Sequence, residues 1–204
     1  MNTEHERENA LTLEILDVID RNKDVSQRHL ARHLGVALGL TNSYLKRCIR
    51  KGLIKVSQAP ANRYLYYLTP QGFTEKSRLT AEYLSISLSF YRKASESCLR
   101  VFDECARRGW RRILLCGVSD LAEIATLRAT ERDVEVIGFL DSASEQKIFL
   151  SRPVWHTYGA VGPHDACLLT ALQSPQARYQ QLQELMAEEL ILVPDVLAAG
   201  RRGQ

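Results

Sequence analysis

One stretch of this sequence carries cationic side chains without a single acidic one. Residues 26–63 hold eight lysines and arginines and no aspartate or glutamate. Such one-sided charge suits a polyanion, because cations that neutralise phosphates release the counterions condensed around them. The stretch also offers hydroxyl and amide side chains, which hydrogen-bond to base edges. The chemistry predicted here is noncovalent recognition of double-stranded DNA.

The residues predicted to contact DNA come from three segments of this stretch. Arg28 and Arg32 are expected to touch the flanking backbone, whereas Asn62 and Arg63 are expected to enter the minor groove. The middle segment is expected to supply the base-edge and phosphate contacts: Thr41, Asn42, Ser43, Lys46, Arg47, Arg50 and Lys51.

The spacing of apolar residues places these side chains on a helix-turn-helix followed by a two-stranded wing. A short amphipathic helix is expected before residue 20, and Ser26 is expected to N-cap a second helix that Gly35 closes. Strands at 53–56 and 64–68 form the wing. The third helix is expected from Val36 to Lys51, with Leu40, Tyr44 or Leu45, and Cys48 or Ile49 facing inward. The alternative is a winged helix that binds only protein.

A long helical segment follows the wing. Residues 73–108 contain neither proline nor glycine, which predicts one long helix or two consecutive ones. Two apolar seams run along it, and two covered sides favour a homodimer through this helix. The alternative is a helix that packs only between two domains of its own chain. The seams are Leu79, Tyr83, Ile86, Phe90, Val101 and Cys105, and Leu84, Leu88, Tyr91, Cys98 and Phe102.

The remaining residues alternate short apolar strands with helices. Strands are expected at 112–117, 134–140, 166–172 and 190–193, helices at 119–130 and 174–188, and a minor strand at 148–150. This order predicts an α/β Rossmann-like domain with a parallel sheet. The predicted fold is therefore an N-terminal α+β winged helix (1–72), a long linker and dimerisation helix (73–108) and the Rossmann-like domain (109–204).

The turn after the first of these strands is the candidate ligand site. Backbone N–H groups at such a turn bind phosphates, and an acidic residue after the second strand binds a ribose. A G-x-G-x-x-G fingerprint is absent, and an acidic residue at the helix start would repel a pyrophosphate. Three possibilities stay open for this site: a nucleotide-sugar or similar small metabolite, NAD(H), or no ligand. The candidate residues are Gly117, Val118, Ser119, Asp120, Asp141 and Ser142.

Catalytic and metal sites are not predicted. Ser119, His156, His164 and Asp165 lack the spacing of a triad, and no G-x-S-x-G sequence is present. The chain is therefore not expected to be an enzyme or to require a cofactor. The five scattered cysteines fit a reducing cytoplasm, either as apolar filler or as oxidant sensors.

Charge and hydropathy narrow the partners further. Residues 1–80 hold 13 basic and 8 acidic side chains, a balance of +5, and residues 109–204 hold 9 and 12, a balance of −3. Only the first half suits a polyanion. No apolar run is long enough to span a bilayer, so we expect a cytoplasmic protein without a membrane partner.

Two resemblances extend these expectations. The first lies in two stretches, GVALGLTNSYLKRCIRKGLIKV and RYLYYLTPQGFTEKSRLTAEYL. The second stretch contains the pattern Y-x-Y-x-LTP-x-G-x-x-EK-x-x-L from Tyr64 to Leu79. Together they resemble MarR-type winged-helix regulators associated with exopolysaccharide clusters. This resemblance covers about residues 10–95 and implies a transcriptional regulator of surface polysaccharide genes.

The second resemblance lies in the C-terminal half. ILLCGVSDLAEIA, followed by VEVIGFLDS, is similar to the nucleotide-sugar-binding N-terminal domain of sialic-acid-type acetyltransferases, and more loosely to CoA- and NAD-binding domains. It implies a nucleotide-sugar or nucleotide effector. The leading hypothesis is therefore a DNA-binding regulator with a sensing domain. The alternatives are a nucleotide-sugar-metabolism enzyme and a protein-interaction adaptor.

Overall fold

The computed structural model describes residues 2–59 and 63–198. It contains two compact units, Met1–Ser87 and Leu88–Gln204. Helix α4 (Pro70–Arg108) is one continuous helix of 39 residues and contributes to both units, so the segment after the wing is a single helix and not two. No helix of the described residues is long and apolar enough to cross a membrane.

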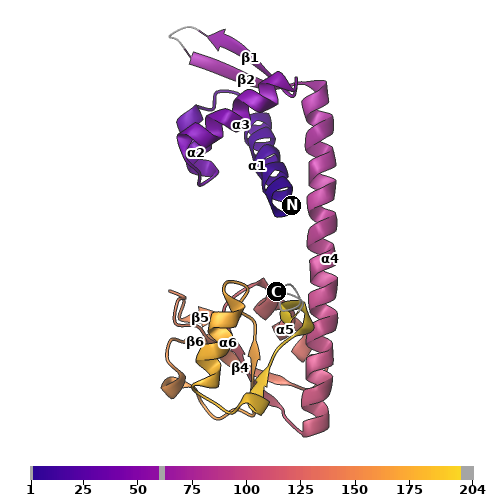
Figure 1. Ribbon diagram of the computed structural model, residues 1–204, viewed down its shortest axis with the longest axis vertical. Helices are drawn as coiled ribbons and strands as arrows, with labels where there is room; N and C mark the ends of the chain where they lie inside the picture. Colours follow the sequence, from indigo (N-terminus) through magenta and orange to yellow (C-terminus); the bar gives the residue numbers. More distant parts are fainter. Residues whose placement is uncertain (1, 60–62, 199–204) are drawn as a thin grey trace. The chain divides into compact units, whose positions relative to one another are not determined.

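Three helices and a hairpin precede α4 in the N-terminal unit (Figure 1). They are α1 (Asn2–Arg21), α2 (Gln27–His33), α3 (Leu38–Arg50), β1 (Ile54–Ala59) and β2 (Arg63–Leu68). Ser26 caps α2 as predicted, because its Oγ accepts a hydrogen bond from the His29 N–H at 3.1 Å. Gly35 follows that helix with φ +61°, a conformation that favours glycine. Helix α1 begins well before the predicted apolar stretch, since its polar first residues contain no helix breaker.

The core of this unit tests the predicted inward face of α3. Leu45 and Cys48 are buried there, and Tyr44 and Ile49 pack against the same core. Leu40 is 40% exposed, so its predicted inward orientation is wrong. A helix turns 100° per residue, and this places Leu40 about 100° from the centre of the buried face.

The sequence Thr69-Pro70-Gln71-Gly72 joins the wing to α4 by close packing. Thr69 Oγ1 donates to the carbonyl oxygen of Gly52 at 2.7 Å and accepts from the Gly72 N–H at 3.0 Å. A Cβ on Gly72 would lie 2.0 Å from the carbonyl oxygen of Leu53. Thr69 and Gly72 are therefore fixed by these contacts, and proline suits the first helical position because it lacks an N–H that would be unpaired there.

A six-stranded sheet of order β5-β6-β4-β3-β7-β8 forms the centre of the C-terminal unit. All neighbouring strands are parallel except β5, which pairs antiparallel with β6. Numbered along the chain, the parallel strands have the order 3-2-1-4-5 of a Rossmann-like fold. The order in which successive strands are added changes sides between β3 and β7, which are themselves parallel. The strands are β3 (Arg112–Cys116), β4 (Glu135–Leu140), β5 (Ile148–Phe149), β6 (Arg152–Trp155), β7 (Ala166–Leu169) and β8 (Ile191–Leu192).

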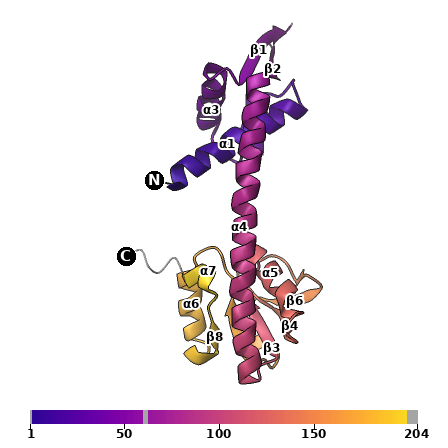
Figure 2. The same cartoon turned by 90° about the vertical axis from the view of Figure 1, so that its right-hand side faces the viewer.

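Helices cover both faces of this sheet (Figures 1 and 2). Ile113 and Leu115 of β3 lie in the core shared with α4 and α5 (Asp120–Ala129), whereas Leu114 and Cys116 lie in the core that includes Leu182 of α6 (Pro175–Gln183). This alternation follows from the two-residue period of a strand. The predicted Rossmann-like α/β fold is confirmed.

Several element boundaries differ from the prediction. Strand β6 was not predicted, because Pro153 and its charged neighbour obscure a strand of four residues. Helix α6 ends at Gln183, before the predicted end, and a 3-10 turn at Glu188–Leu190 precedes β8. Two further short elements complete the chain, the 3-10 turn Tyr158–Ala160 and helix α7 (Asp195–Ala198).

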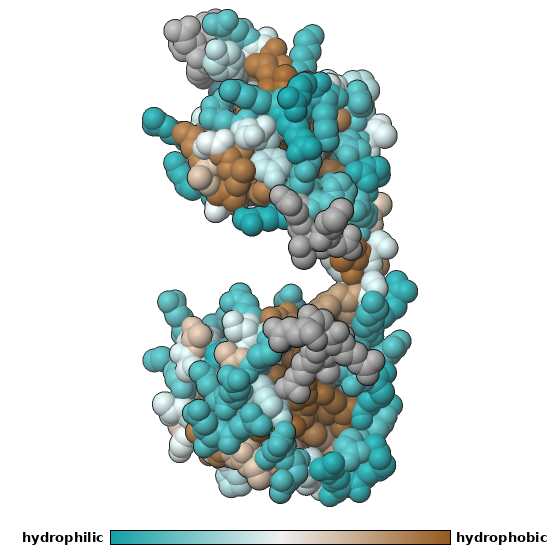
Figure 3. All heavy atoms as spheres, in the orientation of Figure 1, coloured by the Kyte–Doolittle hydropathy of each residue, from teal (hydrophilic) through white to brown (hydrophobic). Residues whose placement is uncertain are grey.

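The part of α4 from residue 83 to residue 91 carries apolar side chains that the described residues leave exposed. Figure 3 shows brown and tan spheres on this part of the helix. Leu79 before it and Ala94, Cys98 and Phe102 after it are buried in the two cores. The exposed side chains are Tyr83 (60%), Leu84 (52%), Ile86 (52%), Leu88 (53%) and Tyr91 (37%).

Candidate functional site

The outward face of α3 carries the hydroxyl and the cations that were predicted to contact DNA. Thr41, Leu45 and Cys48 point into the core, so the opposite side of the helix presents Ser43, Lys46 and Arg50. All three are exposed, as is Lys51 directly after the helix. Arg28 and Arg32 of α2 are exposed too. The two helices therefore offer a cationic surface, whose charge suits the phosphates of a duplex.

Arg47 is held differently from the other cations of α3. Its Nη1 lies 2.8 Å from the Glu8 Oε1 of α1, and its side chain is 43% exposed. Glu8 was not among the predicted site residues, because nothing in the local sequence indicates that α1 returns to α3. The carboxylate fixes the orientation of Arg47 and offsets its charge.

One of the predicted DNA contacts needs correction, and two lie wholly or partly outside the described residues. Thr41 is fully buried and its Oγ1 donates to the Ala37 carbonyl oxygen at 3.2 Å, so it does not reach a base edge. Asn42 is half-buried at the edge of the outward face, and its Oδ1 accepts no hydrogen bond from the described residues. Asn62 lies outside the described residues, and of Arg63 only the backbone in β2 is described.

Sequence reasoning missed two exposed groups on this unit. Leu38 and Leu40 in the first turn of α3 are 41% and 40% exposed, although Leu40 was predicted to face the core. Lys55 of β1 is exposed and adds a cation to the wing. The absence of acidic residues between positions 26 and 63 was the available signal for Lys55.

A cavity of about 490 Å³ lies at the carboxyl ends of β3, β4 and β7, where the strand order of the sheet reverses. This is the position at which Rossmann-like sheets bind ligands. Five of the six predicted ligand residues line it: Gly117, Val118, Ser119, Asp120 and Asp141. The prediction missed Gln146, Gln173 and Arg178, which reach the same cavity from loops and from α6.

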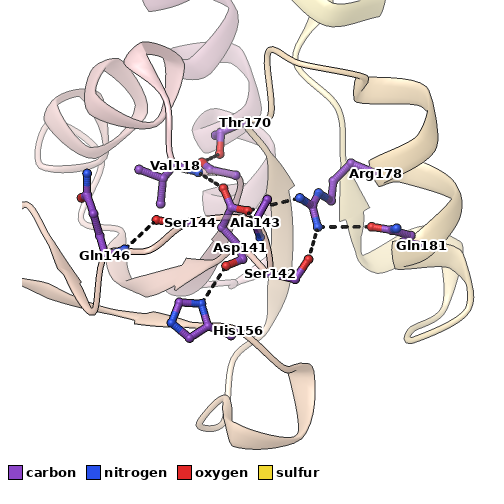
Figure 4. A network of polar contacts seen from close by, with 11 residues as sticks. Val118, Asp141, Ser142, Ala143, Ser144, Gln146, His156, Thr170, Arg178 and Gln181 are labelled. Atoms are coloured by element: carbon purple, nitrogen blue, oxygen red, sulfur yellow. Dashed lines mark hydrogen bonds and ion pairs between the residues drawn. The ribbon is translucent and has the colours of Figure 1, made fainter.

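Asp141 is the centre of the polar contacts at this cavity (Figure 4). Its Oδ2 accepts from the Val118 N–H at 2.9 Å, and its Oδ1 accepts from the Ala143 N–H at 3.0 Å. Arg178 Nη2 lies 3.2 Å from the same Oδ1, and Arg178 Nη1 donates to Ser142 Oγ at 3.0 Å. Both carboxylate oxygens of Asp141 are therefore engaged, and Ser142 takes part through Arg178.

The loop between β3 and α5 is fixed to β7 by two side chains. Ser119 Oγ donates to the Thr170 carbonyl oxygen at 2.6 Å and accepts from the Ala122 N–H at 3.2 Å as the N-cap of α5. Thr170 Oγ1 donates to the Gly117 carbonyl oxygen at 2.6 Å. Gly117 has φ +109°, and a Cβ there would lie 2.6 Å from the backbone of Ala171. The Ser119 hydroxyl therefore has a structural task already.

His156 and Asp165, which were considered for a triad with Ser119, hydrogen-bond to other groups instead. Asp165 Oδ2 accepts from the N–H groups of Arg111 and Arg112, at 2.7 and 2.8 Å. His156 Nδ1 lies 3.0 Å from the Asp141 carbonyl oxygen. Among the described residues, no group of three or more His, Cys, Asp or Glu side chains forms a metal site.

All five cysteines are buried and free. Burial raises the pKa of the Cys48 thiol to about 11 and that of Cys98 to about 12. A contact with the Cys116 thiol, together with burial, raises the pKa of Cys167. Thiols that stay protonated at neutral pH are poor nucleophiles, which favours apolar packing over oxidant sensing for Cys48, Cys98 and Cys167.

Comparison with known proteins supports the N-terminal assignment. A family model described as winged helix-turn-helix DNA-binding matches residues 8–55, which run from α1 into β1. No curated protein matches the chain.

A solved structure described as "PigF with SAH" matches 94% of this chain at 15% identity, with a TM-score of 0.25. The chain spans 57% of the length of that structure. This neighbour was solved with SAH, which speaks against the prediction that the chain is not an enzyme. That prediction is withdrawn, although a likeness of this size assigns no activity.

The family match and the exposed cations of α2 and α3 agree with each other. Together they show that the N-terminal unit contains a winged helix-turn-helix DNA-binding domain.

Proposed function

We propose that this chain is a homodimeric transcriptional regulator whose C-terminal domain binds a small-molecule effector. The observation that carries the proposal is the outward face of α3, where Ser43, Lys46 and Arg50 are exposed on a matched DNA-binding domain. In helix-turn-helix proteins the second helix of the motif enters the major groove. The resemblance of Tyr64–Leu79 to regulators of exopolysaccharide clusters supports surface polysaccharide genes as the targets.

The exposed apolar segment of α4 supports a homodimer. Of the exposed apolar side chains, Leu84, Leu88 and Tyr91 lie on one side of the helix, and a second copy of the same helix would cover that side. A C2 dimer also suits DNA, because paired helix-turn-helix units bind two half-sites about one helical turn apart.

The cavity at Asp141 supports an effector that has both hydroxyl and anionic groups. The Asp141–Arg178 pair balances one charge with another inside the cavity. A ribose hydroxyl would replace Arg178 at Asp141, and the released guanidinium would bind a phosphate. A nucleotide-sugar or a related nucleotide has both groups, which makes this class our candidate effector.

The cavity is connected to α4 through α5. Ala122 and Ala125 of α5 lie in the same core as Cys98 and Phe102 of α4, and Arg128 Nη2 donates to Tyr91 Oη at 2.9 Å. An effector that displaces the start of α5 would therefore move α4. We propose that this motion shifts the population between two dimer geometries and so changes the spacing of the two α3 helices.

The outward face of α3 is tested by Arg50→Ala. We expect the affinity for duplex DNA to fall roughly fivefold, the equivalent of about 1 kcal/mol for one exposed ionic contact. Arg92→Ala, which removes an exposed arginine of α4, is the control and should bind like the native chain. Fluorescence anisotropy with a labelled duplex measures both. Equal affinities for native chain and Arg50→Ala would contradict this placement of α3.

The dimer is tested by Leu88→Glu. A carboxylate in an apolar contact between two helices carries a desolvation cost, so we expect this variant to dissociate at micromolar concentration. Leu127→Glu is matched to it, because Leu127 of α5 is 52% exposed and Leu88 is 53% exposed. Light scattering after size exclusion should give twice the 23.1 kDa chain mass for the native chain and for Leu127→Glu. A native chain of monomer mass would refute the dimer.

The effector is tested by thermal denaturation with UDP-sugars, CMP-sugars, NAD(H), CoA and SAH. A nucleotide-sugar at a hundredfold excess over its Kd should stabilise the folded chain by about 2.7 kcal/mol, which raises Tm by several degrees. Arg178→Ala should abolish the increase. Arg132→Ala breaks the ion pair of Arg132 with Asp103, away from the cavity, and should retain it. The proposal fails if no member of the panel raises Tm, or if Arg178→Ala responds like the native chain.

A further inference from the structure

Leu40 lies at the edge of the outward face of α3, next to polar side chains of that face. It is 40% exposed, and it shares one stripe of the helix with Ser43 and Arg47, three and seven residues later. Single exposed leucines are common on protein surfaces and need no explanation by themselves. The position of Leu40 is unusual because the surface beside it is cationic and is proposed to bind DNA.

The start of α3 is shaped for close approach. Leu40 is the third residue of the helix, and in helix-turn-helix proteins the first residues of this helix contact base edges. Gly39 precedes it, and a Cβ on Gly39 would meet no atom within 4 Å. The helix therefore presents no side chain at the position directly before Leu40.

The major groove presents one apolar group to such a side chain. Each base pair displays hydrogen-bond donors and acceptors there, and only thymine adds a C5-methyl group. A leucine makes no hydrogen bond, so the methyl is the group on a base edge that it can recognise. Lys46 and Arg50 on the same face supply the attraction to the phosphates on either side.

We infer that Leu40 is a specificity-determining residue that packs against the C5-methyl group of thymine in the major groove. This inference rests on the proposed DNA binding and adds a sequence preference to it. Ser43 and Arg47 on the same stripe read the neighbouring base edges or phosphates. Loss of the methyl contact removes one buried carbon, which is worth about fourfold in affinity.

The experiment removes the methyl group from the DNA and the leucine from the protein. A binding duplex is first selected from a random library with the full chain. Each thymine of that duplex is then replaced in turn by deoxyuridine, which pairs identically but lacks the methyl group. For the native chain, one or two of these replacements should weaken binding about fourfold. For Leu40→Ala, the same replacements should leave the affinity unchanged.

Leu38→Ala is the matched control. Leu38 is a leucine of the same helical turn with 41% exposure, but it lines a different depression with Tyr64 and Tyr66. It lies about 160° around the helix from Leu40. This variant should keep the sensitivity of the native chain to deoxyuridine.

The outcomes separate this inference from the proposed function. If native chain binds every deoxyuridine duplex like its thymine parent, or if Leu40→Ala keeps the native sensitivity, the inference is overturned while DNA binding stands. A selected site without thymine would overturn it as well. If no duplex is enriched, the proposed function fails and the inference fails with it.

Discussion

Helix α4 supplies side chains to the hydrophobic core of the DNA-binding domain and to one of the two cores of the α/β domain. Leu79 is buried in the core of the DNA-binding domain, and Ala94, Cys98 and Phe102 are buried in the core of the α/β domain. The helix starts where Gly72 packs directly on the backbone of Leu53, so its first turn is fixed to the wing. Each of these two cores includes side chains of α4, so this helix is a covalent and packed link from one domain to the other.

Local rules predicted most of the fold. Ser26, Gly35 and Gly117 stand where a cap or a left-handed conformation requires them, and a reader of the sequence can recognise each from its neighbours alone. The inward face of α3 was harder, because Leu40 is an apolar residue that the fold turns outward. Periodicity assigns leucine to a core by default, and the exposed Leu40 breaks that assumption.

The candidate cavity shows the same division between local and distant information. The turn at Gly117 and the carboxylate at Asp141 were predictable from the order of strands and helices. The ion pair of Asp141 with Arg178 was not predictable, because Arg178 lies on α6, 37 residues later in the chain. Glu8 reaches Arg47 from α1 in the same way. Contacts between residues so far apart depend on packing, which no local pattern records.

The central claim is that α2 and α3 form a surface that binds the phosphates of duplex DNA. The salt dependence of binding tests it most directly, because each neutralised phosphate releases about 0.9 counterion. Arg28, Arg32, Lys46, Arg50 and Lys51 together predict a logarithm of affinity that falls with the logarithm of salt concentration at a slope of about −4 or steeper. A slope near zero, or no binding to duplex at low salt, would contradict the claim and favour a domain that binds protein.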